Sequence, residues 1–490
     1  MSEQQSLRIC LATSEVTPFA KTGGLADVTS ALSAFLHEAG HEVRVLMPRY
    51  PRVDEVAEDI SPVKGLQDLS IRIGNETFRY SIDVTTLPGG NLPVYLLRCP
   101  ALYARDGIYT QDRDEHVRFI MLSRAAIEMC QHTGFAPDIF HCHDWHTALI
   151  PIYLKTIYAW DKLFAATRSV LTIHNIGYQG IFPASYYHDL GFDGATEYLH
   201  QEDLGRGRIN FMKTGILYAD LITTVSPTYA REIQGEEYGM GLDGLLRQRS
   251  GSVIGILNGV DYTEWNPASD PLIPAKFHAR RMTGKAKCKL ALLAELGLEQ
   301  DANRPLIGIV SRLVGQKGIE LIEEVIPYML ERRDFAMAIL GNGEQRYEDF
   351  FYWLQKRFPN RVCFYRGFNN RLAHWIEAGS DMFLMPSLYE PCGLNQMYSL
   401  KYGTLPIVRE TGGLADSVEL VNPAAETGTG IVFKDYNAQG LSWAVDQALN
   451  LYAKPKLWRK IMKNGMAKDY SWERQGEIYI ELFRHLKKTS

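Results

Sequence analysis

The sequence lacks paired cysteines, long apolar runs and a large excess of charge of either sign. Its seven cysteines form no C-x-x-C pair, and Cys10 lies inside an apolar segment, so we expect reduced thiols rather than a disulfide framework. No apolar run approaches the roughly 20 residues that span a bilayer. The formal net charge of −5 gives no electrostatic basis for binding nucleic acid or an anionic membrane. An anionic ligand must therefore be held by local basic groups.

The N-terminus also lacks the features of a targeting segment. Residues 1–7 lead almost directly into an apolar strand, without a basic region, a signal-type apolar core or a Ser/Arg-rich transit segment. We therefore expect a cytoplasmic protein with no membrane partner. A mature plastid form is the alternative that this pattern leaves open.

The chain repeats one hexapeptide. At 490 residues it is too long for one compact core, so about two large domains are expected. TGGLAD occurs at residues 22–27 and again at 411–416. Because the repeat has no fixed short period, it excludes a solenoid or propeller and favours two similar domains. Each copy lies between an apolar run and an amphipathic stretch, which predicts a strand, a glycine-rich turn and a helix start where amide N–H groups can receive an anion.

Short apolar segments alternate with helical patterns along most of the chain. A strand at 7–12, a helix at 25–39 and a strand at 43–47 predict the first unit of a doubly wound parallel sheet. Alternating patterns at 80–84 and 94–97 predict hairpin-like strands. Further parallel strands are expected at 139–143, 169–173, 221–225, 306–310, 335–340, 362–365, 382–385, 405–408 and 430–433.

The predicted fold class is α/β, with two Rossmann-like domains. We place the first at residues 1–252 and the second at 253–468, with a C-terminal helix in 469–490 that packs back on the first. Polar residues follow the predicted strands directly, at the carboxyl ends where open parallel sheets bind ligands.

Three basic residues stand beside these predicted strand ends. Lys21 precedes the first glycine pair, whereas Arg312 and Lys317 follow the predicted strand at 306–310. Two cations opposite a glycine-rich loop could clamp a diphosphate, and each charge-assisted hydrogen bond contributes roughly 1.5 to 3 kcal/mol. For any one of them alone a solvated surface cation is the better interpretation, whereas their combination with the loops favours the clamp.

The segment YEPCGL at 389–394 follows another predicted strand. A glutamate just before a glycine-bearing helix start, here Glu390, can accept hydrogen bonds from sugar hydroxyls while the next backbone N–H groups face the ligand. A plain N-terminal cap is the alternative. The position of Glu390 at the same expected sheet edge as Arg312 and Thr411 favours a binding role.

Three weaker motifs lead elsewhere. HCHDWH at 141–146 suggests metal ligands, but its first two residues point to opposite faces of a strand and no second cluster completes a tetrahedral set, so we expect no metal site. Asp112 and Asp114 match an acidic DxD pattern in a charged stretch, for which a solvated turn is the better interpretation. GNG at 341–343 lacks the third glycine of a dinucleotide fingerprint and gives little support for a dehydrogenase.

Taken together, the chain resembles the bacterial glycogen synthases and plant starch synthases, family 5 retaining glycosyltransferases of the GT-B fold, over nearly its whole length. The blocks that carry the resemblance are KTGGLADV at 21–28, HDWH at 143–146, TIHN at 172–175, YQG at 178–180, SRL at 311–313, QKG at 316–318, EPCGL at 390–394 and KYGT at 401–404, which leads to 411–416. So many ordered blocks are far more specific than any single glycine-rich pattern.

The resemblance implies two Rossmann-like domains that face each other across a deep cleft. The implied activity is transfer of glucose from ADP-glucose to the non-reducing end of an α-1,4-glucan, such as glycogen, starch or a maltooligosaccharide, with retention of configuration. It implies no cofactor and no metal. A synthase that uses UDP-glucose and a non-catalytic glucan-binding paralogue remain alternatives, whereas a phosphorylase would need a pyridoxal phosphate lysine and a far longer chain.

The resemblance also assigns roles to single residues. The implied catalytic group, near the reacting carbon, the glucose hydroxyls and the leaving diphosphate, is Glu390, His174, Asp144, Arg312 and Lys317. The implied donor contacts, with the aromatic ring of Phe368 on the base, are Lys21, Gly23, Gly24, Phe368, Cys392, Gly393, Leu394, Thr411 and Gly412. The implied acceptor side is Glu15, Asp27 and Tyr109.

Two positions depart from the family pattern. Many related glycosyltransferases carry a second glutamate eight positions after the first, whereas this chain has Tyr398, so ribose recognition is left unassigned. Cys288 stands where the family often has an asparagine, and the neighbouring lysines Lys285 and Lys289 receive no role from the sequence.

Overall fold

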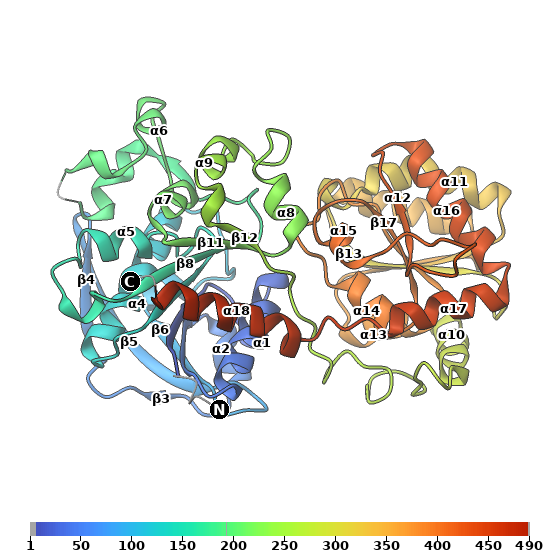
Figure 1. The fold of residues 1–490 in the computed structure, drawn as a ribbon, viewed down its shortest axis with the longest axis horizontal. Helices are drawn as coiled ribbons and strands as arrows, with labels where there is room; N and C mark the ends of the chain where they lie inside the picture. The colour runs from blue at the N-terminus through green and yellow to red at the C-terminus, as the bar shows by residue number, and fades with distance from the viewer. Residues whose placement is uncertain (1–5, 193, 489–490) are drawn as a thin grey trace. The chain divides into compact units, whose positions relative to one another are not determined.

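The computed structural model describes residues 6–192 and 194–488, which form two compact α/β units (Figure 1). The first unit takes the chain up to Val225, Ala230–Gly259 and everything from Trp472 onward. The second takes Ser226–Tyr229 and Val260–Ser471. The α/β class predicted from the sequence is confirmed.

The first unit is built on one ten-stranded sheet, whose main path runs β12-β11-β8-β7-β1-β2-β6-β5-β3, with β4 beside β5. The strands are β1 (Arg8–Ala12), β2 (Glu42–Pro48), β3 (Ser61–Pro62), β4 (Leu69–Ile73), β5 (Glu76–Thr86), β6 (Pro93–Arg98), β7 (Ile139–His143), β8 (Arg168–Ile173), β11 (Leu221–Thr224) and β12 (Val253–Gly255). From β12 to β6 neighbouring strands are parallel, whereas β5 runs antiparallel to β6 and forms the predicted hairpin-like extension. A separate small sheet pairs β9 (Ile181–Pro183) with β10 (Arg208–Asn210).

Helices complete the first unit. They are α1 (Gly24–Glu38), α2 (Pro51–Val56), α3 (Pro100–Tyr103), α4 (Glu115–His132), α5 (Ile150–Lys155), α6 (Gln201–Gly205), α7 (Phe211–Tyr218), α9 (Asp243–Gln248) and α18 (Trp472–Lys488), while α8 (Pro227–Glu232) includes residues of both units. The C-terminal helix α18 packs against α1, and a Cβ added at Gly476 would lie 2.2 Å from the Phe35 ring. Lys487 Nζ also pairs with Asp138 Oδ1 at 2.8 Å. Close approach at a glycine and this ion pair therefore hold α18 in the first unit.

The second unit contains a six-stranded, all-parallel sheet in the order β15-β14-β13-β16-β17-β18. Its strands are β13 (Leu306–Leu313), β14 (Ala336–Gly343), β15 (Val362–Arg366), β16 (Met382–Met385), β17 (Leu405–Arg409) and β18 (Ile431–Phe433). Its helices are α10 (Thr283–Glu295), α11 (Ile319–Arg332), α12 (Gln345–Arg357), α13 (Asn370–Gly379), α14 (Asn395–Lys401), α15 (Gly412–Ser417), α16 (Ala438–Tyr452) and α17 (Pro455–Met466). Numbered from β13, the strand order is 3-2-1-4-5-6, which places a topological switch point between β13 and β16.

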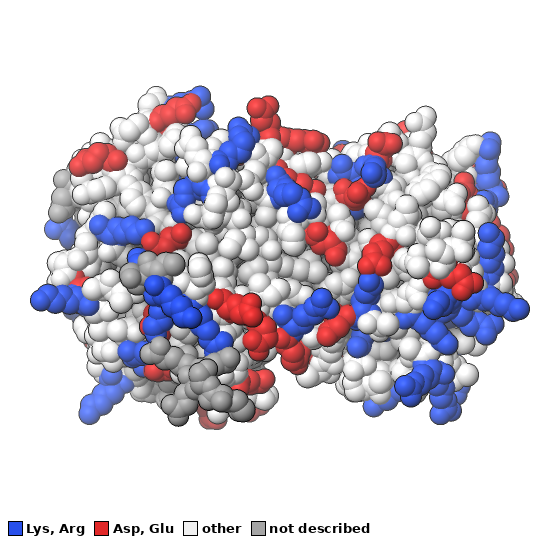
Figure 2. Space-filling model, viewed as in Figure 1, with Lys and Arg blue, Asp and Glu red and all other residues white. Residues whose placement is uncertain are grey.

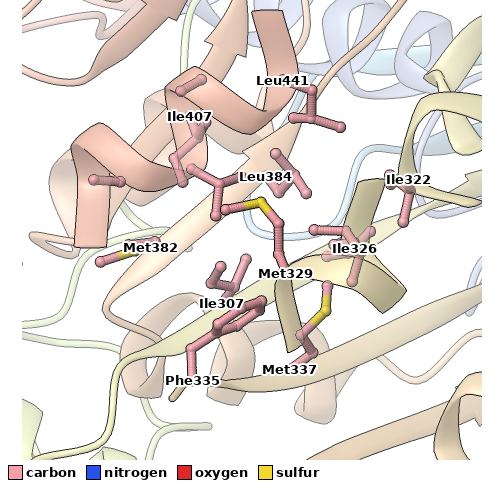
Figure 3. Close-up of a cluster of buried hydrophobic side chains, with 14 of the residues drawn as sticks. Ile307, Ile322, Ile326, Met329, Phe335, Met337, Met382, Leu384, Ile407 and Leu441 are labelled. Carbon is pink, nitrogen blue, oxygen red and sulfur yellow. The ribbon is translucent and has the colours of Figure 1, made fainter. Parts of the chain in front are cut away.

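The core of the second unit lies between this sheet and the helices on it. Ile322, Ile326 and Met329 project from α11 at helical spacing toward Leu384 of β16 and Leu441 of α16 (Figure 3). The strands are apolar because helices cover both faces of a parallel sheet, and this explains why the sequence showed continuous apolar runs here. The strands predicted for this unit are confirmed in position.

The surface carries mixed charges, and Figure 2 shows Lys and Arg interspersed with Asp and Glu over the face in view, in keeping with the small net charge. Among the helices within residues 6–192 and 194–488, none is long and apolar enough to cross a membrane.

Two of the lysines that the sequence left unassigned, Lys285 and Lys289, are structural, whereas Lys287 is exposed. Lys285 of α10 is buried and donates to the carbonyl of Ala378 at 3.1 Å and to the Thr404 hydroxyl at 2.7 Å. Lys289, one turn later, donates to Asp381 Oδ2 at 2.7 Å. Burial lowers the pKa of Lys285 to about 8. Both ammonium groups therefore fix α10 to α13 and to the residues just before β16 and β17.

A buried carboxyl nearby makes the stability of this unit depend on pH. Burial raises the pKa of Glu377 to about 8, against the opposing hydrogen bond from Ser399 and the charge of Lys285. Because the folded state holds a proton that the unfolded state releases near pH 4.5, stability is lost as pH rises toward 8. We expect Glu377→Gln to unfold like the wild type at pH 5 and to be more stable by roughly 1 to 3 kcal/mol at pH 8. Urea unfolding at both pH values measures this difference.

The exposed Glu324→Gln on α11 is the matched control and should differ little from the wild type at either pH. If the unfolding free energies of Glu377→Gln and the wild type differ by the same amount at pH 5 and at pH 8, Glu377 is not the group that makes stability depend on pH.

Candidate functional site

In the second unit, the loops that follow β13, β16 and β17 meet at the carboxyl edge of the sheet, next to the switch point. The first loop is the 3-10 turn η5 (Gly315–Lys317), and Leu388 N donates to the Gln316 carbonyl at 2.9 Å. Gly318 has φ +71°, and a Cβ there would lie only 2.0 Å from the carbonyl oxygen of Pro386. A glycine is required at this point because the two loops touch through their backbones.

Two predicted catalytic residues form an ion pair at this edge. Lys317 Nζ donates to Glu390 Oε2 at 2.6 Å, and the hydroxyl of Ser387 donates to the same oxygen at 3.0 Å. Glu390 is only 5% exposed, so its carboxylate is held in a fixed place by these two donors. The arrangement sets a carboxylate and an ammonium group side by side where an open parallel sheet binds its ligand.

The second glycine loop supports the same segment from the other side. Gly413 N donates to the carbonyl of Glu390 at 3.1 Å. At Gly412, which has φ +43°, a Cβ would lie 1.9 Å from that same carbonyl oxygen. Gln396 of α14 donates to the carbonyls of Cys392 and Gly393 at 3.0 and 3.1 Å. The glycines of this copy, which follow Thr411, therefore pack against the segment that carries Glu390.

Three more predicted residues of this unit are Arg312, of the catalytic group, and the donor contacts Phe368 and Leu394. Arg312 is exposed near the end of β13, and Phe368 is 75% exposed just past β15, after Gly367 with φ +118°. Leu394 is half-buried and caps the start of α14. Arg312 lies within the last residues of β13, whereas Phe368 and Leu394 follow β15 and β16, so all three lie toward the carboxyl edge of one sheet.

In the first unit, Glu15 follows β1 at the corresponding edge. Its carboxylate accepts hydrogen bonds from the backbone N–H of Thr22 at 2.5 Å, from the Thr22 hydroxyl at 2.6 Å and from the Tyr109 hydroxyl. Tyr109 in turn stacks on His146, with 4.6 Å between the ring centroids. Glu15 is buried and its oxygens are occupied. In this structure it anchors the first glycine loop.

The first glycine loop is otherwise open. Lys21 Nζ pairs with Asp27 Oδ1 at 2.7 Å, and both side chains are partly exposed. No described atom lies within 4 Å of a Cβ built at Gly23 or Gly24. The two copies of TGGLAD therefore differ: the first leaves room around its glycines, whereas the second is packed against backbone.

Asp144 and His174 come together at the ends of β7 and β8. Asp144 has φ +54° and accepts the backbone N–H of His174 at 2.7 Å. Burial raises the pKa of Asp144 to about 7, with a further contribution from Glu15 and opposition from the two backbone N–H groups it accepts. Burial lowers the pKa of His174 to about 3, so its imidazole is neutral at physiological pH. The pair therefore offers an uncharged imidazole beside a carboxyl that titrates near neutrality.

Comparison with known proteins decides the family. The starch synthase catalytic domain family matches residues 8–248, and the family of glycosyl transferases group 1 matches residues 297–465. The chain is 44% identical to a glycogen synthase of Koribacter versatilis, with 99% of each chain covered, and 42% identical to one of Thermotoga maritima, with 98% of each covered. This chain belongs to the glycogen and starch synthase family.

Solved structures agree with this assignment. The catalytic domain of starch synthase IV from Arabidopsis thaliana, bound to ADP and acarbose, superposes with a TM-score of 0.91 at 34% identity, covering 99% of this chain and 100% of that one. A sucrose-phosphate synthase from Thermosynechococcus elongatus, at 17% identity and a TM-score of 0.58, shares the fold. The predicted GT-B fold of this synthase family is confirmed.

The motifs set aside in the sequence of this synthase have structural explanations. Asp112 and Asp114 both pair with Arg105, which fits a turn tied by its own ion pairs. Gly341 and Gly343 lie where a Cβ would meet the carbonyl oxygens of neighbouring β13 at 2.2 and 2.1 Å. Within residues 6–192 and 194–488, no group of three His, Cys, Asp or Glu side chains is placed to hold a metal ion.

Sequence reasoning missed two residues of the site in this synthase. Ser387 donates to Glu390, and its only signal was its position two residues past β16. His143 bonds to His174 through Nδ1 at 3.0 Å. Its motif was considered for metal ligands and as a block of the family resemblance, but His143 itself received no role from the sequence. Alternation along β7 places His141 and His143 on one face of the sheet, which could have indicated a contact with the neighbouring strand.

Proposed function

We propose that this protein is an ADP-glucose:1,4-α-glucan 4-α-glucosyltransferase that extends the non-reducing end of glycogen, starch or a maltooligosaccharide with retention of configuration. The observation that carries the proposal is the ion pair between Lys317 and the buried Glu390 at the switch point of the second sheet. Family membership supports the reaction class, and the starch synthase structure that carries ADP and acarbose supports the two substrate types.

In the proposed mechanism, the second unit binds the donor. Glu390 accepts hydrogen bonds from glucose hydroxyls, and the backbone around Cys392 places the sugar ring. Lys317 and Arg312 neutralise the charge that develops on the departing ADP, while Phe368 stacks on the base. Preorganised groups of this kind contribute most where charge appears in the transition state. Because lysine and arginine side chains do this work, the proposed reaction requires no metal.

The first unit supplies the remaining groups. Lys21 contacts the donor diphosphate from the open glycine loop, and Asp144 and His174 lie near the reacting carbon. Glu15, Asp27 and Tyr109 shape the acceptor side, where the bonds of Glu15 to Thr22 and Tyr109 support an anchoring role. Attack occurs on the face that the ADP leaves, and the departing phosphate helps to remove the proton of the acceptor hydroxyl.

Labelled donors test the proposal directly. The purified protein should transfer labelled glucose from ADP-glucose to glycogen and to a maltooligosaccharide, and an α-1,4-specific amylase should release the label. If the protein uses UDP-glucose in preference to ADP-glucose, the proposed donor is wrong and UDP-glucose takes its place. Binding of glucan without incorporation from either donor would show a non-catalytic paralogue and overturn the proposal.

Lys21→Gln tests the first glycine loop. We expect the apparent KM for ADP-glucose to rise roughly 10-fold, because the substitution removes one charge-assisted contact to the diphosphate. This rise in KM is smaller than for an unpaired cation, because Lys21 must give up its ion pair with Asp27 to bind the donor. Initial rates over a range of donor concentrations measure it, with the exposed Lys64→Gln as the control. Unchanged KM and kcat would remove Lys21 from the donor site.

A further inference from the structure

His143 and His174 form a hydrogen-bonded pair at the ends of two adjacent strands. β7 and β8 are parallel, and His143 lies opposite Thr172, two residues before His174. His143 Nδ1 lies 3.0 Å from His174 Nε2. His143 is fully buried, whereas His174 is partly exposed. The pair therefore links a buried ring to a ring of the candidate catalytic group.

The bond leaves one ring nitrogen of His174 for a ligand. Burial lowers the pKa of both imidazoles, so each is neutral and carries a single N–H. One ring must donate and the other accept. If His143 Nδ1 donates, the proton of His174 lies on Nδ1, which is then a donor; if His174 Nε2 donates, its Nδ1 is an acceptor. Because Nε2 of His174 is already engaged, only Nδ1 is left to meet a substrate hydroxyl.

A third histidine packs beside this pair but makes its hydrogen bond elsewhere. The ring centroids of His141 and His143 are 4.1 Å apart, and His141 Nε2 bonds to the Thr172 hydroxyl at 2.6 Å. His143 Nε2 is buried and makes no hydrogen bond with the residues that the structure describes. The bond to His174 is thus the only side-chain hydrogen bond in that part of the chain that orients the His143 ring, and it fixes His174 in return.

We propose that His143 is a positioning residue, which holds the His174 ring with Nδ1 available to the substrate and fixes its tautomer. The catalytic consequence rests on the proposed function, in which His174 lies near the reacting carbon. The neutral imidazole then presents one defined hydrogen-bonding atom to the transferred glucose. An orienting partner of this type acts on turnover more than on the binding of the donor, since the ring is placed for the transition state.

Nitrogen-15 NMR of histidine-labelled protein tests the pair without any activity. The His174 signals, assigned by their loss in His174→Ala, should show a single tautomer in the wild type. His143→Phe keeps a ring of similar size but no nitrogen, and we expect it to yield a mixture of tautomers. His143→Asn places an amide close to the position of Nδ1 and should restore the single form. If His143→Phe does not fold, His143→Gln replaces it, because its longer side chain carries the amide away from that position.

Kinetics test the catalytic consequence. We expect His143→Phe to lower kcat roughly 10- to 100-fold, the range for outer partners that orient metal-bound histidines, with the KM for ADP-glucose within about 2-fold. His143→Asn should recover most of this loss. His141→Phe, on the same strand face but bonded to Thr172, is the matched control and should stay near wild-type turnover. An unchanged His174 tautomer in His143→Phe overturns the inference, whereas absence of turnover in the wild type overturns only the proposed function.

Discussion

Replacing Glu390 with glutamine is expected to lower kcat roughly 100- to 1000-fold with the fold intact, the range for loss of one preorganised group at a reacting centre. Glutamine has nearly the same shape, and the Ser387 hydroxyl can still donate to its amide oxygen. The charge that pairs with Lys317 and the second acceptor for glucose hydroxyls are both lost. Initial rates at saturating ADP-glucose, with thermal unfolding as a check on the fold, measure the effect.

A double-mutant cycle separates two roles for this carboxylate. Lys317→Met alone leaves Glu390 buried without its counter-ion, which is strongly unfavourable. The double variant combines Glu390→Gln with Lys317→Met. If Glu390 only positioned Lys317, this variant would turn over no more slowly than Lys317→Met alone. A contact between Glu390 and the glucose makes the double variant slower than either single variant. Near-normal turnover of Glu390→Gln would exclude Glu390 from the catalytic group.

Local sequence predicted the sheets of this protein well. The run at 382–385 was recognised as a strand because helices on both faces demand continuous apolar residues, and β16 occupies the same residues. The antiparallel extension at β5 was visible as alternation, because Asp83 lies on the face opposite Ile82 and pairs there with Arg49 and Arg98. Strand order was not accessible to periodicity, because it depends on which distant segments pair.

The sequence predicted which residues belong to the candidate site, but not which contacts they make with one another. Glu390 and Lys317 were both named, but nothing local indicates that residues 73 positions apart form an ion pair. Glu15 is expected on the acceptor side, but nothing local indicated that its carboxylate binds Thr22 and Tyr109. Such contacts follow from the meeting of loops at strand ends, which sequence patterns place only roughly.

The repeated hexapeptide shows the limit of local reasoning most clearly. Identical residues predicted identical strand–turn–helix units, and both turns do start helices, α1 and α15. Their surroundings differ, because Gly413 approaches the Cys392 backbone whereas Gly24 has no described neighbour within 4 Å of an added Cβ. One substitution at one motif position should therefore have two different effects.

Gly413→Ala is expected to destabilise the protein by roughly 1 to 3 kcal/mol, the usual cost of overpacking, because its Cβ would lie 2.2 Å from the Cys392 carbonyl oxygen. The segment carrying Glu390 must shift to make room, and a displacement near 1 Å can reduce turnover about 100-fold. Gly24→Ala, the matched control, should leave the unfolding temperature unchanged. If the open loop receives the donor diphosphate, Gly24→Ala should still raise the KM for ADP-glucose, because the added methyl group enters the space that the diphosphate would occupy. Thermal unfolding and donor kinetics of both variants separate these effects, and an unaltered unfolding temperature and kcat in Gly413→Ala would contradict the packing role of the second copy.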